Sequence, residues 1–88
     1  MNKIGIFIDS MKGGGAERVV LNLANEFENR KIPLVLILRF KDGPYLSKLD
    51  SNIIIHELHT NNPLLIIIRL IKTCKKNKIK TLLTVSMF

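Results

Sequence analysis

A run of three glycines beside charged residues is the part of the chain best suited to bind a ligand. The residues that carry this chemistry are Lys12, Gly13, Gly14, Gly15, Glu17 and Arg18. Glycines let the backbone approach a ligand closely and adopt positive φ angles. A helix that starts just after them offers unpaired N–H groups and the positive end of its dipole, which favour an anion. The pattern predicts a site for a phosphate-bearing, nucleotide-type ligand.

Two familiar phosphate-binding motifs do not fit this run. The Walker A motif requires Gly-x-x-x-x-Gly-Lys-Ser/Thr, and the chain contains no such segment. In the dinucleotide fingerprint Gly-x-Gly-x-x-Gly, Gly13 and Gly15 occupy the first two positions, but Arg18 occupies the third. An arginine there cannot provide the close packing of helix on strand that the third glycine gives. Both motifs are therefore excluded.

The side chains around the glycines each have a functional and a structural interpretation. Glu17 is either part of the site or a first-turn carboxylate that stabilises the helix dipole. Lys12 either neutralises a phosphate or is an exposed loop lysine. Ser10 either contacts a ligand or closes the turn, and turn closure is the favoured interpretation. No catalytic residue follows from these types and spacings.

Other reactive side chains do not form a convincing site. His56 and His59 lack the His-Glu-x-x-His spacing, and in a strand they point to opposite faces, so we predict no metal. The single cysteine, Cys74, excludes an internal disulfide and fits a reducing cytosol. Cys74 is expected to be a small buried apolar residue. At helical spacing it shares one face with Leu64, Ile67, Ile68 and Ile71.

The hydrophobic pattern predicts four strands and two main helices. Strands are expected at residues 4–8, 34–38, 53–55 (extending toward 58) and 79–85, with a single helical turn at 45–49. The first helix starts at Ala16, and its apolar face is Ala16, Val19, Val20, Leu23, Ala24 and Phe27. Asn62 and Pro63 are typical of the N-cap and first position of the second helix, which runs to about Asn77. This alternation predicts an α/β, Rossmann-like parallel sheet with strand order 3-2-1-4 and one helix on each face. The glycine loop then lies at the carboxyl end of the central strand, beside the switch point between strands 1 and 4.

Residues 14–24, Gly-Gly-Ala-Glu-Arg-Val-Val followed by Leu-x-Leu-Ala, resemble the amino-terminal domain of family 4 glycosyltransferases. These are retaining enzymes with two Rossmann-like domains, an architecture called GT-B. The resemblance implies that Gly14 and Gly15, with Gly13 beside them, face the interdomain cleft near the donor diphosphate. Lys12, Glu17 and Arg18 would support that loop. The chain departs from the family pattern at two places. It has Lys31-Ile32-Pro33 where a glycine often ends the first helix, and residues 78–80 are basic where an acidic residue is frequent just before the fourth strand.

The resemblance further implies that residues 1–88 form a partial amino-terminal, acceptor-side domain. The carboxyl-terminal domain, which binds the sugar nucleotide, would be absent, so we expect this piece to be inactive alone. The apolar strand at 79–85 has nothing after it to cover it, which also suggests truncation. The complete enzyme would transfer a sugar from a nucleotide diphosphate sugar to a saccharide or lipid-linked acceptor, with no other cofactor. The alternative is a non-catalytic Rossmann-like module that binds a phosphorylated ligand or a partner chain.

The net charge of +7 suggests an anionic partner, such as nucleic acid, anionic lipid or a phosphorylated ligand. Lys72, Lys75, Lys76, Lys78 and Lys80 cluster around one helix end. The favoured interpretation is a solvated basic rim; contact with a membrane surface ranks next, and nucleic-acid binding last, because no aromatic residues are interleaved with the lysines. No apolar run approaches the length of a membrane span, and the amino terminus lacks a signal-peptide pattern. We therefore predict a cytoplasmic location, with peripheral membrane contact as an option.

Overall fold

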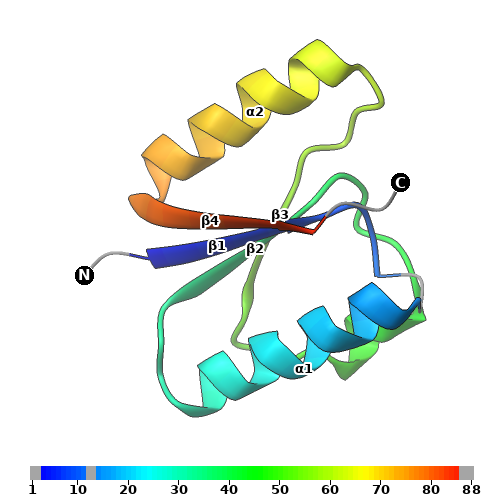
Figure 1. Cartoon of the computed structure of the whole chain (residues 1–88), viewed down its shortest axis with the longest axis vertical. Helices are drawn as coiled ribbons and strands as arrows, with labels where there is room; N and C mark the ends of the chain where they lie inside the picture. Colours follow the sequence, from blue (N-terminus) through cyan, green and yellow to red (C-terminus); the bar gives the residue numbers. More distant parts are fainter. Residues whose placement is uncertain (1–2, 12–13, 86–88) are drawn as a thin grey trace.

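Four apolar segments form a parallel sheet between two helices (Figure 1) in the computed structural model, which describes residues 3–11 and 14–85. The elements in this part of the chain are β1 (Lys3–Ile8), α1 (Gly15–Asn29), β2 (Leu34–Leu38), the 3₁₀ helix η1 (Pro44–Lys48), β3 (Ile54–Glu57), α2 (Pro63–Lys76) and β4 (Ile79–Val85). The strand order is β3-β2-β1-β4, and every neighbouring pair is parallel. The predicted α/β sheet and its strand order are confirmed.

Alternating side chains of the central strands supply the cores on the two sides of the sheet. Ile6 and Leu36 belong to the cluster on the α1 side, whereas Val35 and Ile37 belong to the cluster on the α2 side. All five residues of β2 are buried, as expected for a parallel strand that is covered on both faces. Among the described residues, the α1-side cluster contains eleven buried apolar residues and the α2-side cluster only three. The two faces are therefore packed unequally.

The contact face of α1 differs from the predicted one. Val19 was expected to face the core but is 65% exposed, whereas Leu21 is buried. Leu21 shares a cluster with Leu49 and Ile53, which follow η1, and Asn25 is hydrogen-bonded to the backbone of the same segment. This connection packs beside α1 and buries the side of the helix that carries Leu21. The periodicity gave the correct helix and most of its contact face, since Val20 and Ala24 are buried and Leu23 and Phe27 pack against the same cluster. Val19 is the wrong member of that face, and Leu21 was not predicted.

The helix α2 begins as predicted but presents a different face to the sheet. The side chain of Asn62 accepts hydrogen bonds from the N–H groups of Leu64 and Leu65, which confirms the N-cap. The residues that pack on the sheet are Ile66 and Leu70. The expected buried face is wrong, because its four large members are exposed and do not belong to the core on this side of the sheet. Their exposed fractions are 65% for Leu64, 56% for Ile67, 38% for Ile68 and 50% for Ile71. In the described part of the chain, no helix has the length and apolar character needed to cross a bilayer.

Within residues 3–11 and 14–85, three residues other than glycine adopt left-handed backbone angles, each shortly after a helix or strand. Lys31 has a φ of 60°, His59 of 54° and Lys78 of 56°. Lys31 follows Arg30, the C-cap of α1, and so occupies the position where many helices have a glycine. The missing glycine at the end of the first helix is thus replaced by a lysine in the conformation that glycine would favour.

Candidate functional site

A pocket of about 760 Å³ lies at the carboxyl edge of the sheet, between the strand ends and the start of α2. Parallel strands bring their carboxyl ends to one edge, so residues far apart in the sequence meet there. We call this the edge pocket, and its lining is Phe7, Asp9, Arg39, Asn61, Pro63, Ile66, Ile67, Leu70, Thr84 and Val85. It includes residues at the ends of both β1 and β4, where the sequence predicts the switch point. Its walls are mainly apolar, which suits a ligand with an apolar part.

An ion pair supplies the only charges in this lining. Arg39 Nε lies 2.5 Å from Asp9 Oδ1, and the Arg39 guanidinium carbon lies 5.4 Å from the centre of the Phe40 ring. The backbone N–H of Phe40 donates to the carbonyl of Asp9, which ties the end of β2 to the end of β1. Because each charge faces an opposite one, the wall is nearly neutral overall. The edge pocket therefore offers a binding surface with one polar corner.

The start of α1 lies at the same edge of the sheet (Figure 1) but outside the lining of the edge pocket. Gly14 is its N-cap, and the Gly14 N–H donates to Glu17 Oε2 at 3.0 Å. Glu17 is only 6% exposed, and no described group bonds to its other oxygen, Oε1. The carboxylate thus satisfies the cap and stabilises the positive end of the helix dipole. The structural interpretation of Glu17 has a direct physical basis in this contact.

The two described glycines of the loop have different surroundings. A Cβ added to Gly14 would lie 3.0 and 3.1 Å from the two Glu17 carboxylate oxygens. At Gly15 an added Cβ would meet no other atom within 4 Å. Gly14 has a φ of −74° and Gly15 is helical, so neither uses the positive φ that glycine permits. Gly14 makes room for Glu17, and Gly15 leaves open space above the first turn of α1.

The remaining predicted site residues are only partly placed. Arg18 is exposed on the first turn of α1, and its backbone N–H makes the first hydrogen bond of the helix, to the Gly14 carbonyl. Ser10 is buried just after β1. Lys12 and Gly13, which the sequence also assigns to the site, lie outside the residues that the structure describes. The structure therefore brings together Gly14, Gly15 and Glu17, with Arg18 beside them.

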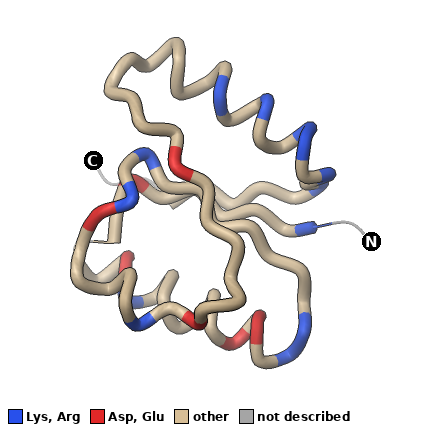
Figure 2. Tube along the Cα trace, turned by 180° about the vertical axis from the view of Figure 1, so that it is seen from behind, with Lys and Arg blue, Asp and Glu red and all other residues tan. Residues whose placement is uncertain are grey.

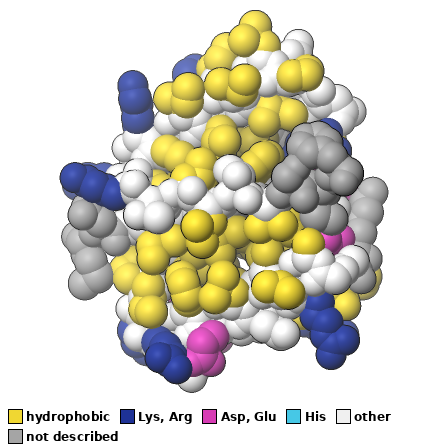
Figure 3. Space-filling model, in the orientation of Figure 1, with side chains coloured by type: hydrophobic (Ala, Val, Ile, Leu, Met, Phe, Trp, Pro, Cys, Tyr) yellow, Lys and Arg dark blue, Asp and Glu magenta, His cyan; other side chains and the backbone are white. Residues whose placement is uncertain are grey.

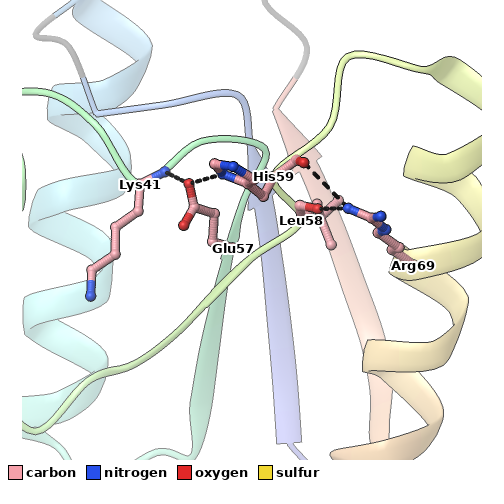
Figure 4. A network of polar contacts seen from close by, with 5 residues as sticks. All are labelled: Lys41, Glu57, Leu58, His59 and Arg69. Carbon is pink, nitrogen blue, oxygen red and sulfur yellow. Dashed lines mark hydrogen bonds and ion pairs between the residues drawn. The ribbon is translucent and has the colours of Figure 1, made fainter.

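A network of polar contacts joins the loops at the far side of the same edge (Figure 4). Glu57 Oε2 accepts from the Lys41 N–H at 3.0 Å and lies 3.1 Å from His59 Nδ1. These two contacts, the first more than the second, lower the pKa of Glu57 below its ordinary value of 4.5. Arg69 of α2 donates through Nη1 to the carbonyls of Leu58 and His59. The network fastens the middle of α2 to the segment that follows β3.

The reactive side chains tested for metal chemistry stay apart. Within residues 3–11 and 14–85, no three His, Cys, Asp or Glu side chains gather closely enough to hold a metal ion. His59 packs edge-on against Phe40, with ring centres 5.7 Å apart. Cys74 is half-buried, and this burial raises the pKa of its thiol.

Sequence reasoning missed the two charged residues of the edge pocket. Asp9 directly follows β1 and Arg39 directly follows β2, and a charged residue at the end of each of two buried neighbouring strands is a usable signal. No protein-family model matches this chain, and neither does a curated protein or a solved structure. The functional proposal therefore rests on the residues and geometry of this chain.

Proposed function

We propose that this chain forms the acceptor-side half of a retaining glycosyltransferase that uses a nucleotide diphosphate sugar. The start of α1 would face the donor diphosphate, and the edge pocket would hold an apolar part of the acceptor. The complete reaction would need a second, donor-binding domain of GT-B type. That partner domain supplies most of the contacts to the sugar nucleotide in this proposal.

The observation that carries the proposal is the open space above Gly15 at the first turn of α1. The first hydrogen bond within the helix comes from Arg18, so the N–H groups of Gly15, Ala16 and Glu17 have no partner inside the helix. They stand at the positive end of the dipole, at the sheet edge where parallel α/β folds bind ligands. The likeness of residues 14–24 to family 4 glycosyltransferases adds the class of ligand.

The chemistry follows from where charge develops during sugar transfer. The diphosphate gains negative charge as it leaves the sugar, and fixed N–H groups stabilise that charge without reorganising. The Glu17 carboxylate stays bound to Gly14 and leaves the following N–H groups to the ligand. The side chain of Glu17 is therefore a positioning group for the helix start.

Nuclear magnetic resonance of the ¹⁵N-labelled chain tests this assignment. UDP-glucose should shift the amide signals of Gly15, Ala16 and Glu17, with saturation on the order of millimolar, because in this proposal residues 1–88 supply only a minor part of the contacts to the donor. Uridine, which lacks the diphosphate, should leave these signals unchanged. Gly15→Ala should reduce the shifts, since its methyl group fills the open space without meeting a protein atom.

Three results would count against the proposal. Equal shifts with uridine would show that the diphosphate is not recognised, and shifts confined to other parts of the chain would place the ligand elsewhere. Inorganic pyrophosphate that reproduces every effect of UDP-glucose would favour the alternative, a module for phosphorylated ligands in general. Binding of UDP-glucose in the micromolar range would contradict the need for a second domain.

A further inference from the structure

The outer face of α2 is apolar although it points away from the sheet. Its four large residues, Leu64, Ile67, Ile68 and Ile71, form what we call the outer stripe, and between 38% and 65% of each is exposed. Their spacing of three and four residues places them on one side of the helix. Figure 3 shows apolar side chains gathered over α2. Contiguous exposed apolar surface of this kind marks a contact site for a protein or a membrane.

Basic residues lie at the end of the outer stripe. Lys72 and Lys75 each follow a stripe residue, Ile68 or Ile71, by four positions, so they stand on the same side of α2. Six of the 14 Lys and Arg residues, and none of the seven Asp and Glu residues, come after Glu57 in the chain. Figure 2 shows this separation: α2 carries only basic charges, whereas acidic residues lie in the rest of the molecule. The partner of this surface must therefore tolerate or carry negative charge.

A second copy of the chain fits this surface poorly. Two copies that met through α2 with the helices parallel would bring Lys72 and Lys75 close to the same residues of the other copy, and like charges in an interface oppose association. With the helices antiparallel, these lysines would meet no acidic residue on α2 of the other copy. Lys80 lies on β4 and Lys78 just before it, where lysines on a sheet edge disfavour pairing with another strand. An acidic surface avoids this repulsion.

We propose that α2 lies on an anionic membrane surface, with the outer stripe in the boundary between headgroups and acyl chains. Helices that bind in this way combine a face of large apolar residues with nearby lysines. Lys72 and Lys75 can extend along the stripe and place their ammonium groups at the headgroup level. Lys76, Lys78 and Lys80 add attraction to the anionic lipid. This docking surface uses neither the start of α1 nor the donor, and it shares with the proposed function only Ile67, which also lines the edge pocket.

Co-sedimentation with lipid vesicles tests the proposal. The chain should bind vesicles of phosphatidylcholine mixed with phosphatidylserine, bind pure phosphatidylcholine far less, and dissociate as the salt concentration rises. Lys72→Gln with Lys75→Gln should weaken binding about 25-fold, since each lysine contributes roughly a factor of five. Leu64→Ser with Ile71→Ser should weaken binding at least about tenfold.

Matched variants on the α1 side separate this surface from general effects of charge and hydrophobicity. Val19 is as exposed as Leu64, at 65%, so Val19→Ser is the control for the apolar pair. Lys31→Gln with Lys48→Gln is the control for the charged pair. Both controls should bind like the unaltered chain, and circular dichroism confirms that each variant is folded.

The proposal has clear contrary outcomes. It is overturned if the stripe and control variants bind equally, or if neutral and anionic vesicles bind equally. Sedimentation velocity without lipid gives a separate check. A dimer of the unaltered chain that Leu64→Ser with Ile71→Ser converts to monomer would show that a second copy covers the outer stripe, and would also overturn it.

Discussion

Replacing Gly14 by alanine tests whether the buried carboxylate of Glu17 holds the start of α1. The new Cβ would lie 3.0 and 3.1 Å from the two carboxylate oxygens, so the carboxylate must shift by a few tenths of an ångström, which stretches its hydrogen bond to the Gly14 N–H. The backbone angles at Gly14, φ −74° and ψ 176°, suit alanine and add no strain. The cost is therefore the weakening of a hydrogen bond to a charged acceptor, at most about 1.5–3 kcal/mol of unfolding free energy.

A double-mutant cycle with Glu17→Ala isolates this contact. Without the carboxylate, Gly14→Ala should change stability by less than about 0.5 kcal/mol. Alanine reduces the entropy of the unfolded chain, but it is a poorer N-cap than glycine, and the two effects are of similar size. The coupling between the two positions should therefore be measurable, with an upper limit of about 1.5–3 kcal/mol.

Urea unfolding followed by circular dichroism measures the four free energies. Gly15→Ala is the control, because its Cβ meets nothing within 4 Å and the residue is helical. It should leave stability unchanged or raise it by up to about 1 kcal/mol. Additive effects of Gly14→Ala and Glu17→Ala would refute the reasoning, since they would mean that the two residues do not interact.

Three further predictions concern the ends of elements. Lys31→Gly should raise the unfolding free energy by about 0.5–1 kcal/mol, because Lys31 has a φ of 60°; Arg30→Gly, at φ −89°, should lower it in the same thermal melts, and equal effects would contradict this. Asn62→Ala should cost about 1 kcal/mol in urea unfolding, since it removes the cap of α2, whereas Asn61→Ala should not. The lowered pKa of Glu57 gives stability that is present above pH 4.5 and is lost as the pH falls through that lowered pKa. Glu57→Gln should remove this pH dependence, and an unchanged pH profile would show that the contacts of Glu57 are not formed.

Much of the fold could be predicted because several short sequence patterns are compatible with only one type of local structure. The apolar run of β2 can only be a strand buried on both faces, and all five of its residues are buried. Asn62 before Pro63 defines a helix start, since an amide cap and a fixed φ both suit that position. The strand order follows once the elements alternate and the crossovers are right-handed.

The helix faces could not be predicted because the sequence offered more than one apolar side. In α2, Ile66 and Leu70 compete with the outer stripe, and periodicity alone does not tell which side meets the sheet. In α1, the segment after η1 decides that Leu21 is buried. Both outcomes depend on contacts between distant parts of the chain.

The candidate site was partly predictable for a similar reason. The glycine pattern identified the start of α1, but the room that Gly14 makes for Glu17 depends on side-chain geometry. The pairing of Asp9 with Arg39 depends on two strand ends that are 30 positions apart in the sequence. A local sequence pattern does not show which residues from distant positions of the chain will pair.

The unequal packing of the two faces of the sheet has a consequence for how the molecule opens. Among the residues that the structure describes, the α1 side contains eleven buried apolar residues and the α2 side three. Amide hydrogens of α2 should therefore exchange with solvent through a partial opening that leaves β1 and β2 folded. Those of β2 should exchange only when the whole chain unfolds. A lipid surface that holds α2 would slow the first process and leave the second almost unchanged.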